Sequence, residues 1–198
     1  MESDAVAILF YSLSVTLRVF PIVVLIATAI RSVMLLSGLR RSFKTWTRNR
    51  PLAIFSMLTA PGMLITVCFR YVFLALMGAS IESLRIDTTF MEFSPYVVLK
   101  RAPRVAVSAA ALSLAMFVSS YIGLLLLFLP LLLESEISVS LVCFYFGIST
   151  LLNVAVRRGD VDLLRASLRS DWRRGVIELV AFLALAVVTY SIVAVVIL

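Results

Sequence analysis

The sequence predicts an all-α integral membrane protein with about five transmembrane helices, a short β element and one amphipathic helix at the membrane interface. Two of the three observations behind this prediction concern composition. Of the 198 residues, 62% are hydrophobic and 15% are charged, whereas soluble domains average about 45–50% apolar and about 25% charged residues. The mean hydropathy is +1.09. The third observation is that the hydrophobic residues gather in runs of membrane-spanning length.

Five apolar runs are each long enough for a transmembrane helix, which needs about 20 residues. They cover Ala5 to Leu39, Pro51 to Ile81, Val105 to Leu133, Ile137 to Val156 and Leu179 to Leu198. A basic strip at residues 40–50 contains Phe43 and Trp46 among its cations, a composition typical of a membrane interface. We expect one membrane domain over residues 1–198, in which residues 1–50 form the first helix and this strip.

Two connecting segments have patterns of their own. Residues 81–99 at first alternate apolar and polar side chains, and Pro95 then interrupts a run of β-branched and aromatic residues. This pattern favours a short hairpin over a helix. In residues 157–174, which carry six arginines, the apolar side chains recur at helical spacing: Val161, Leu164, Leu168 and Trp172. The second segment is therefore expected to be an amphipathic helix on the membrane surface.

The net charge is +7, from 18 Lys and Arg against 11 Asp and Glu. The cations lie mainly between the apolar runs, where they meet lipid phosphates. We therefore expect the lipid bilayer, and no nucleic acid, as a partner. Residues 81–104 and 157–174 together hold ten Lys and Arg, against six in residues 31–50. This imbalance favours a cytoplasmic position for the N-terminus and for the segments 81–104 and 157–174.

The chain contains no histidine. This absence excludes a Ser-His-Asp triad, a histidine zinc site and an imidazole proton shuttle. The two cysteines, Cys68 and Cys143, lie inside apolar runs, where cysteine usually acts as a small packing residue. The sequence also lacks a glycine-rich nucleotide loop. We expect no cofactor.

Arg70 needs a specific explanation. It follows 19 uncharged residues and precedes 11 more. An arginine at the middle of a membrane helix costs about 2.5–3.5 kcal/mol on insertion scales. Two interpretations remain open at this point. The helix is shorter than the apolar run, so that Arg70 reaches the interface, or the side chain faces the bundle interior and pairs with an acidic or carbonyl group.

The residues around Arg70 have the spacing of a known motif. Pro61-Gly62 is followed by Thr66, Val67 and Arg70, and then by Gly78. This order resembles the intramembrane zinc metalloproteases of the site-2 protease type, in particular small prokaryotic members, in which HExxH follows Pro-Gly and precedes a glycine and a β segment. Thr66 and Arg70 occupy the positions of the two histidines in that family, and Val67 occupies that of the catalytic glutamate.

The resemblance extends more loosely over residues 51–165, which it identifies as a protease-like core. The remaining residues, 166–198, then form the end of the interfacial helix and the last transmembrane helix. Near the end of the fourth run, Asp160 matches the aspartate that serves as a metal ligand in the family, with Asp162 as the alternative if the register shifts. The resemblance implies a multi-pass protein of a prokaryotic cell membrane.

The resemblance also implies a loss of catalysis. Zinc binding needs two histidines one helical turn apart, and peptide hydrolysis needs the glutamate between them. Arg70 cannot replace a ligand, because a guanidinium has no lone pair to offer. We hypothesise instead that Arg70 and Asp160 form an ion pair at the former metal position.

Two classes of function remain open from the sequence. The first is a non-catalytic membrane scaffold that binds or stabilises other membrane proteins or associates with itself. The alternative is a small transporter or channel subunit in which Arg18 and Arg70 line an anion path. A lipid-modifying enzyme that uses carboxylates and arginines is a third class, although the acidic residues are scattered along the chain.

Overall fold

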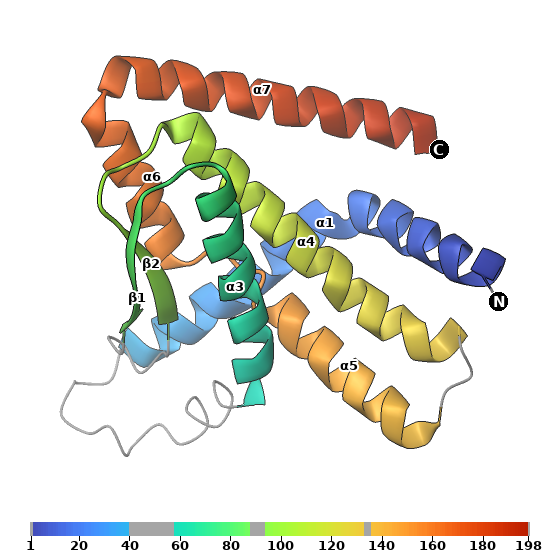
Figure 1. The fold of residues 1–198 in the computed structure, drawn as a ribbon. Coiled ribbons are helices and arrows are strands. Elements are labelled where there is room, and N and C mark those ends of the chain that lie inside the picture. The colour runs from blue at the N-terminus through green and yellow to red at the C-terminus, as the bar shows by residue number, and fades with distance from the viewer. Residues whose placement is uncertain (1, 40–57, 88–93, 133–135, 198) are drawn as a thin grey trace.

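The computed structural model describes residues 2–39, 58–87, 94–132 and 136–197 (Figure 1). The basic strip expected at residues 40–50 lies outside these ranges. The elements that the structure describes, in chain order, are α1 (Glu2–Leu39), α3 (Ala60–Leu76), β1 (Ile81–Asp87), β2 (Ser94–Leu99), α4 (Val105–Leu132), α5 (Ile137–Leu152), α6 (Arg158–Ser170) and α7 (Trp172–Ile197).

Each predicted apolar run contains a helix, but only three of these helices are long enough to cross a membrane. The candidate spans are Leu9–Val33 in α1, Val105–Leu131 in α4 and Trp172–Ile192 in α7. The helices α3 and α5 are shorter, with 17 and 16 residues. The prediction of about five full-length spans is therefore corrected to three long apolar helices and two short ones among the described residues.

The short length of α3 has a local cause at its C-terminal end. Gly78 has a φ of +77°, a left-handed conformation that glycine adopts without steric cost and that commonly follows the last turn of a helix. The Ala79 N–H donates to the Leu74 carbonyl at 3.0 Å, which satisfies one of the carbonyls at the helix end. The chain then turns directly into β1 instead of continuing as a helix to Ile81.

The predicted β element is confirmed as an antiparallel hairpin of β1 and β2. Ile81 lies opposite Leu99, and Asp87 lies opposite Ser94. Pro95 is accommodated opposite Ile86, because a strand of a two-stranded sheet has a free edge that needs no backbone donor.

The helix α4 lies at the centre of the bundle and packs against α1, α3, α5, α6 and α7 (Figure 1). Its buried face is rich in small side chains, which allow helices to approach closely: Ser108, Ala109, Ala111, Ala115, Ser119 and Ser120. The hydroxyls of Ser108 and Ser167 are 2.9 Å apart and join α4 to α6. The small residues of this run therefore have a packing role.

The predicted helix at residues 157–174 is confirmed in part, as the shorter α6 (Arg158–Ser170). Trp172, the last apolar residue of the predicted stripe, belongs to the next helix. Ser167 is buried, whereas Arg165 and Arg169 are exposed. The following helix, α7, begins at Trp172, seven residues before the predicted start at Leu179. Glu178 lies in this added part of α7, and its Oε2 accepts the Ala106 N–H at 3.2 Å, which joins α7 to the beginning of α4.

Candidate functional site

The Pro61-Gly62 pair fixes α3 against α5. The Gly62 N–H donates to Ser149 Oγ at 2.9 Å. A Cβ at position 62 would overlap the carbonyl group of Ser149, so only glycine permits this approach. One and two turns further along α3, Thr66 and Arg70 consequently face the chain that leaves the end of α5.

That chain, residues 153–157, is the irregular connection between α5 and α6, and it is buried almost completely. Buried backbone N–H and C=O groups outside regular structure must find partners, because an unpaired group costs free energy. The Val156 N–H donates to Thr28 Oγ1 of α1 at 3.1 Å. The side-chain amide of Asn153 donates to the Thr59 carbonyl at 2.9 Å. The connection is thus held by polar groups from α1 and from the start of α3.

Arg70 is the central member of this network. It is only 5% exposed, and its Nη2 donates to Asp160 Oδ2 at 2.9 Å and to the Ala155 carbonyl at 3.0 Å. The hypothesised partners are therefore in direct contact, and α3 is tied to the first turn of α6. Although α3 is shorter than predicted, Arg70 turns into the protein interior and does not extend to an interface. Within the described residues, its Nε and Nη1 have no hydrogen-bond partner.

The oxygen of Asp160 that binds Arg70 also accepts a second hydrogen bond. This atom, Oδ2, accepts the Arg157 N–H at 2.8 Å, so the carboxylate caps the N-terminus of α6. A carboxylate in the first turn of a helix is additionally stabilised by the helix dipole. One oxygen atom therefore holds both the buried arginine and the start of α6.

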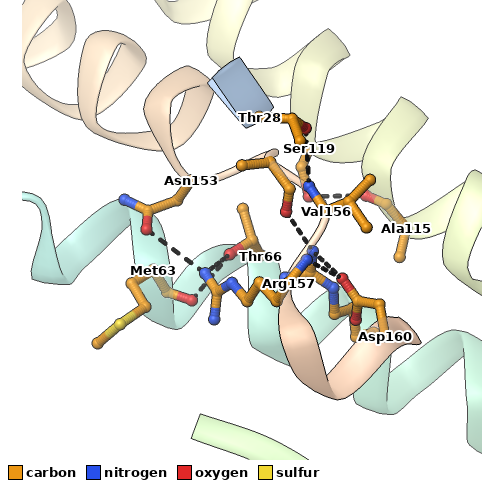
Figure 2. A network of polar contacts seen from close by, with 11 residues as sticks. Thr28, Met63, Thr66, Ala115, Ser119, Asn153, Val156, Arg157 and Asp160 are labelled. Atoms are coloured by element: carbon orange, nitrogen blue, oxygen red, sulfur yellow. Dashed lines mark hydrogen bonds and ion pairs between the residues drawn. The ribbon is translucent and has the colours of Figure 1, made fainter. Parts of the chain in front are cut away.

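Arg157 is the member that the sequence analysis missed. Only 3% exposed, it donates from Nη2 to Thr66 Oγ1 at 3.0 Å and to Asn153 Oδ1 at 3.4 Å (Figure 2). Thr66 in turn donates to the Met63 carbonyl at 2.9 Å. The sequence pattern groups Arg157 with the interfacial cations of residues 157–174. Its position three residues before Asp160, at the start of a helix, is the one local signal of a different role.

The four positions singled out by the resemblance are all buried: Thr66, Val67, Arg70 and Asp160. Arg70 and Asp160 are in direct contact, and Thr66 joins the same network through Arg157. Asp162 is exposed, so Asp160, and not Asp162, is the acidic residue in the interior. Arg18 is exposed on α1, and its carbonyl accepts the Tyr190 hydroxyl of α7 at 3.3 Å. Arg31 of α1 lies close enough to act electrostatically on Arg70.

The donor set of this cluster does not fit a zinc ion. Two guanidinium groups are permanent cations, and the remaining groups are a hydroxyl and one carboxylate. Within the part of the chain that the structure describes, no three His, Cys, Asp or Glu side chains lie together at a metal-binding distance. The arrangement is suited to holding helices and a buried connection in place.

Comparison with protein-family models, characterised proteins and solved structures finds no match to the chain. The role of the cluster therefore has to be inferred from its own contacts.

Replacing Arg70 by Leu should destabilise the protein by about 3–5 kcal/mol, because it leaves the Asp160 charge buried without its cation. Asp160→Leu should cost at least as much, since the Arg157 N–H loses its acceptor as well. The double variant should recover part of the loss, because an apolar pair can replace a buried ion pair. Unfolding in detergent micelles, followed by circular dichroism, measures these differences.

The matched control is Arg174→Leu, which breaks an exposed pair. Arg174 Nε is 3.6 Å from Asp171 Oδ2, and the two side chains are 84% and 53% exposed. The control should change stability by only about 0–1 kcal/mol. If Arg70→Leu is as stable as the unmodified chain, Arg70 does not hold the fold together.

Proposed function

We propose that the protein is a non-catalytic, multi-pass membrane protein with a metalloprotease-like core, which binds or stabilises other membrane proteins. In this proposal the Arg70–Asp160 pair takes the structural place of a catalytic metal. The observation that carries it is the buried contact between Arg70 and Asp160, to which Thr66 is joined through Arg157. With Val67, which is buried on the same helix, these residues hold the positions that would carry the ligands and the general base in a site-2-protease-like enzyme: Thr66, Val67, Arg70 and Asp160.

The chemistry at this point supports a structural role. Asp160 Oδ2 is bonded to two donors, Thr66 Oγ1 accepts from Arg157, and Val67 is apolar. A general base needs a free lone pair near its substrate, and a nucleophile needs an adjacent base. Here Asp160 Oδ2 and Thr66 Oγ1 are engaged by arginines instead, which joins α3 to the start of α6.

The membrane assignment rests on the three long apolar helices and on their exposure. In the candidate span of α7, Leu185 and Val187 are each 65% exposed. A protein in water rarely exposes a continuous apolar surface of this kind. In a bilayer the same surface faces lipid tails or a neighbouring membrane protein, which is where a scaffold would make its contacts.

The correspondence with a metal site can be tested by rebuilding one. Thr66→His and Arg70→His place two imidazoles one turn apart on α3, and Arg157→Ala removes the cation beside them. We expect the triple variant to bind one Co²⁺ ion per chain, detected by its visible absorption and by elemental analysis. Adding Asp160→Asn should weaken the binding. A folded triple variant that takes up no more metal than the unmodified protein would count against the correspondence.

The scaffold role can be tested by photo-crosslinking along α7 in intact membranes. A photoreactive residue at Leu183 or Val187 samples one face of the helix, and one at Leu185 or Val188 samples another. We expect one of these two pairs of positions to form adducts with protein, either a partner or a second copy of this chain. The other pair should form none. The same probe at buried Leu112 of α4 is the control. Lipid adducts alone from all four positions would contradict a scaffold.

One observation favours the alternative of an anion-conducting subunit: Nε and Nη1 of Arg70 are buried donors without a partner among the described residues. An anion path also needs access from water. The burial of Arg70 and its contacts with Asp160 and the Ala155 carbonyl favour the scaffold instead.

Thiol labelling separates these two functions. The background carries Cys68→Ser and Cys143→Ser, because both native cysteines are free. Arg70→Cys is combined with Asp160→Asn so that no carboxylate is left unpaired. We expect a charged thiol reagent to leave position 70 unmodified, while it labels Arg101→Cys at an exposed position. Rapid labelling of position 70 from the aqueous side would favour the anion path.

A further inference from the structure

The second feature that stands out lies away from the Arg70 cluster, where α4 and α7 begin side by side (Figure 1). A Cβ at Gly175 would lie 3.1 Å from Val105 Cγ2 and 3.4 Å from the Leu168 Cα. The first turns of α4 and α7 and the last turns of α6 therefore meet at this point. The contact between Glu178 and the Ala106 N–H holds the same junction.

The segments on either side of this junction carry a concentrated positive charge, which we call the basic end. It consists of seven exposed cations from two distant parts of the chain: Lys100, Arg101, Arg104, Arg165, Arg169, Arg173 and Arg174. Four acidic residues of the described chain accompany these cations: Glu82, Asp162, Asp171 and Glu178. Glu82 lies in β1 beside the end of β2, and Glu178 is engaged by α4. Seven cations against four acidic residues leave an excess of three positive charges.

The position of the basic end indicates which part of a membrane it contacts. Val105 and Trp172 are the first residues of two candidate membrane spans, so the cations directly before and after them lie at the depth of lipid headgroups. Trp172 is 63% exposed at the same level, as is common for tryptophan at a membrane interface. Guanidinium groups bind phosphate oxygens through paired hydrogen bonds.

From this charge, this depth and this chemistry, we infer that the basic end is a docking surface for anionic phospholipid headgroups. It draws its cations from the β2–α4 connection and from the α6–α7 corner, so that a phosphate between them contacts both. Binding there would hold the start of α4 against the start of α7. The inference rests on the proposed membrane location, but it does not depend on the scaffold role or on the Arg70 cluster.

The test compares phosphatidylglycerol with phosphatidylcholine by native mass spectrometry of the full chain released from detergent. We expect the unmodified protein to bind phosphatidylglycerol at least about fivefold more tightly, with a preference that falls as ionic strength rises. The variant Arg104→Gln/Arg173→Gln/Arg174→Gln should lose most of this preference. The control Arg40→Gln/Arg41→Gln/Lys44→Gln removes the same charge from positions that are not part of the basic end, and it should retain the preference.

Three results would overturn the inference. The first is an unchanged preference in the basic-end variant, and the second is an equal loss in both variants, which would reflect net charge alone. The third is equal competition by free glycerol phosphate, which would indicate a small-anion site and not a lipid surface. A parallel experiment measures whether the chain stays in the membrane fraction during alkaline extraction. Release of the unmodified chain into the soluble fraction would refute the membrane location itself. Failure of the lipid test alone would not affect the membrane location.

Discussion

The arrangement of this protein depends on one constraint, which is the burial of an irregular stretch of chain at the centre of an apolar bundle. Residues 153–157 connect α5 to α6 with Val154 and Ala155 entirely enclosed. Helices satisfy their own backbone groups, but a connection of this kind cannot, and no water is at hand in an apolar interior. Its polar groups therefore have to be met by side chains from other helices.

Arg70 and Asp160 meet this need jointly. The guanidinium reaches the Ala155 carbonyl and the carboxylate with the same nitrogen, and the carboxylate reaches the Arg157 N–H with the same oxygen. Each charge therefore serves a backbone group as well as its partner. This explains why a costly ionic pair is retained where an apolar pair of similar volume would pack as well. An apolar pair would leave the carbonyl and the N–H unpaired.

Much of this structure could be predicted from local sequence, since apolar runs of about 20 residues are too long for a typical strand and favour a helix. The hairpin at residues 81–99 was also predictable, because alternation and Pro95 both argue against a helix. Arg70 drew attention because a cation within an apolar run has few acceptable positions. The burial of Arg157 could not be predicted by the same argument. It lies in a segment with five other arginines. Its position before Asp160 is the one local signal, and its contact with Thr66 comes from a distant part of the chain. The ends of α3 and α5 were likewise missed, since they depend on the turn at Gly78 and on the buried connection.

The separation of Arg70 from its partners has a consequence for the order in which the chain can assemble. Asp160 lies 90 residues further along the sequence, which corresponds to roughly 5–20 s of synthesis on a ribosome. For that interval Arg70 has neither Asp160 nor the Ala155 carbonyl to contact. The packing of α3 against the connection between α5 and α6 is therefore a late step in folding, which waits for a single carboxylate.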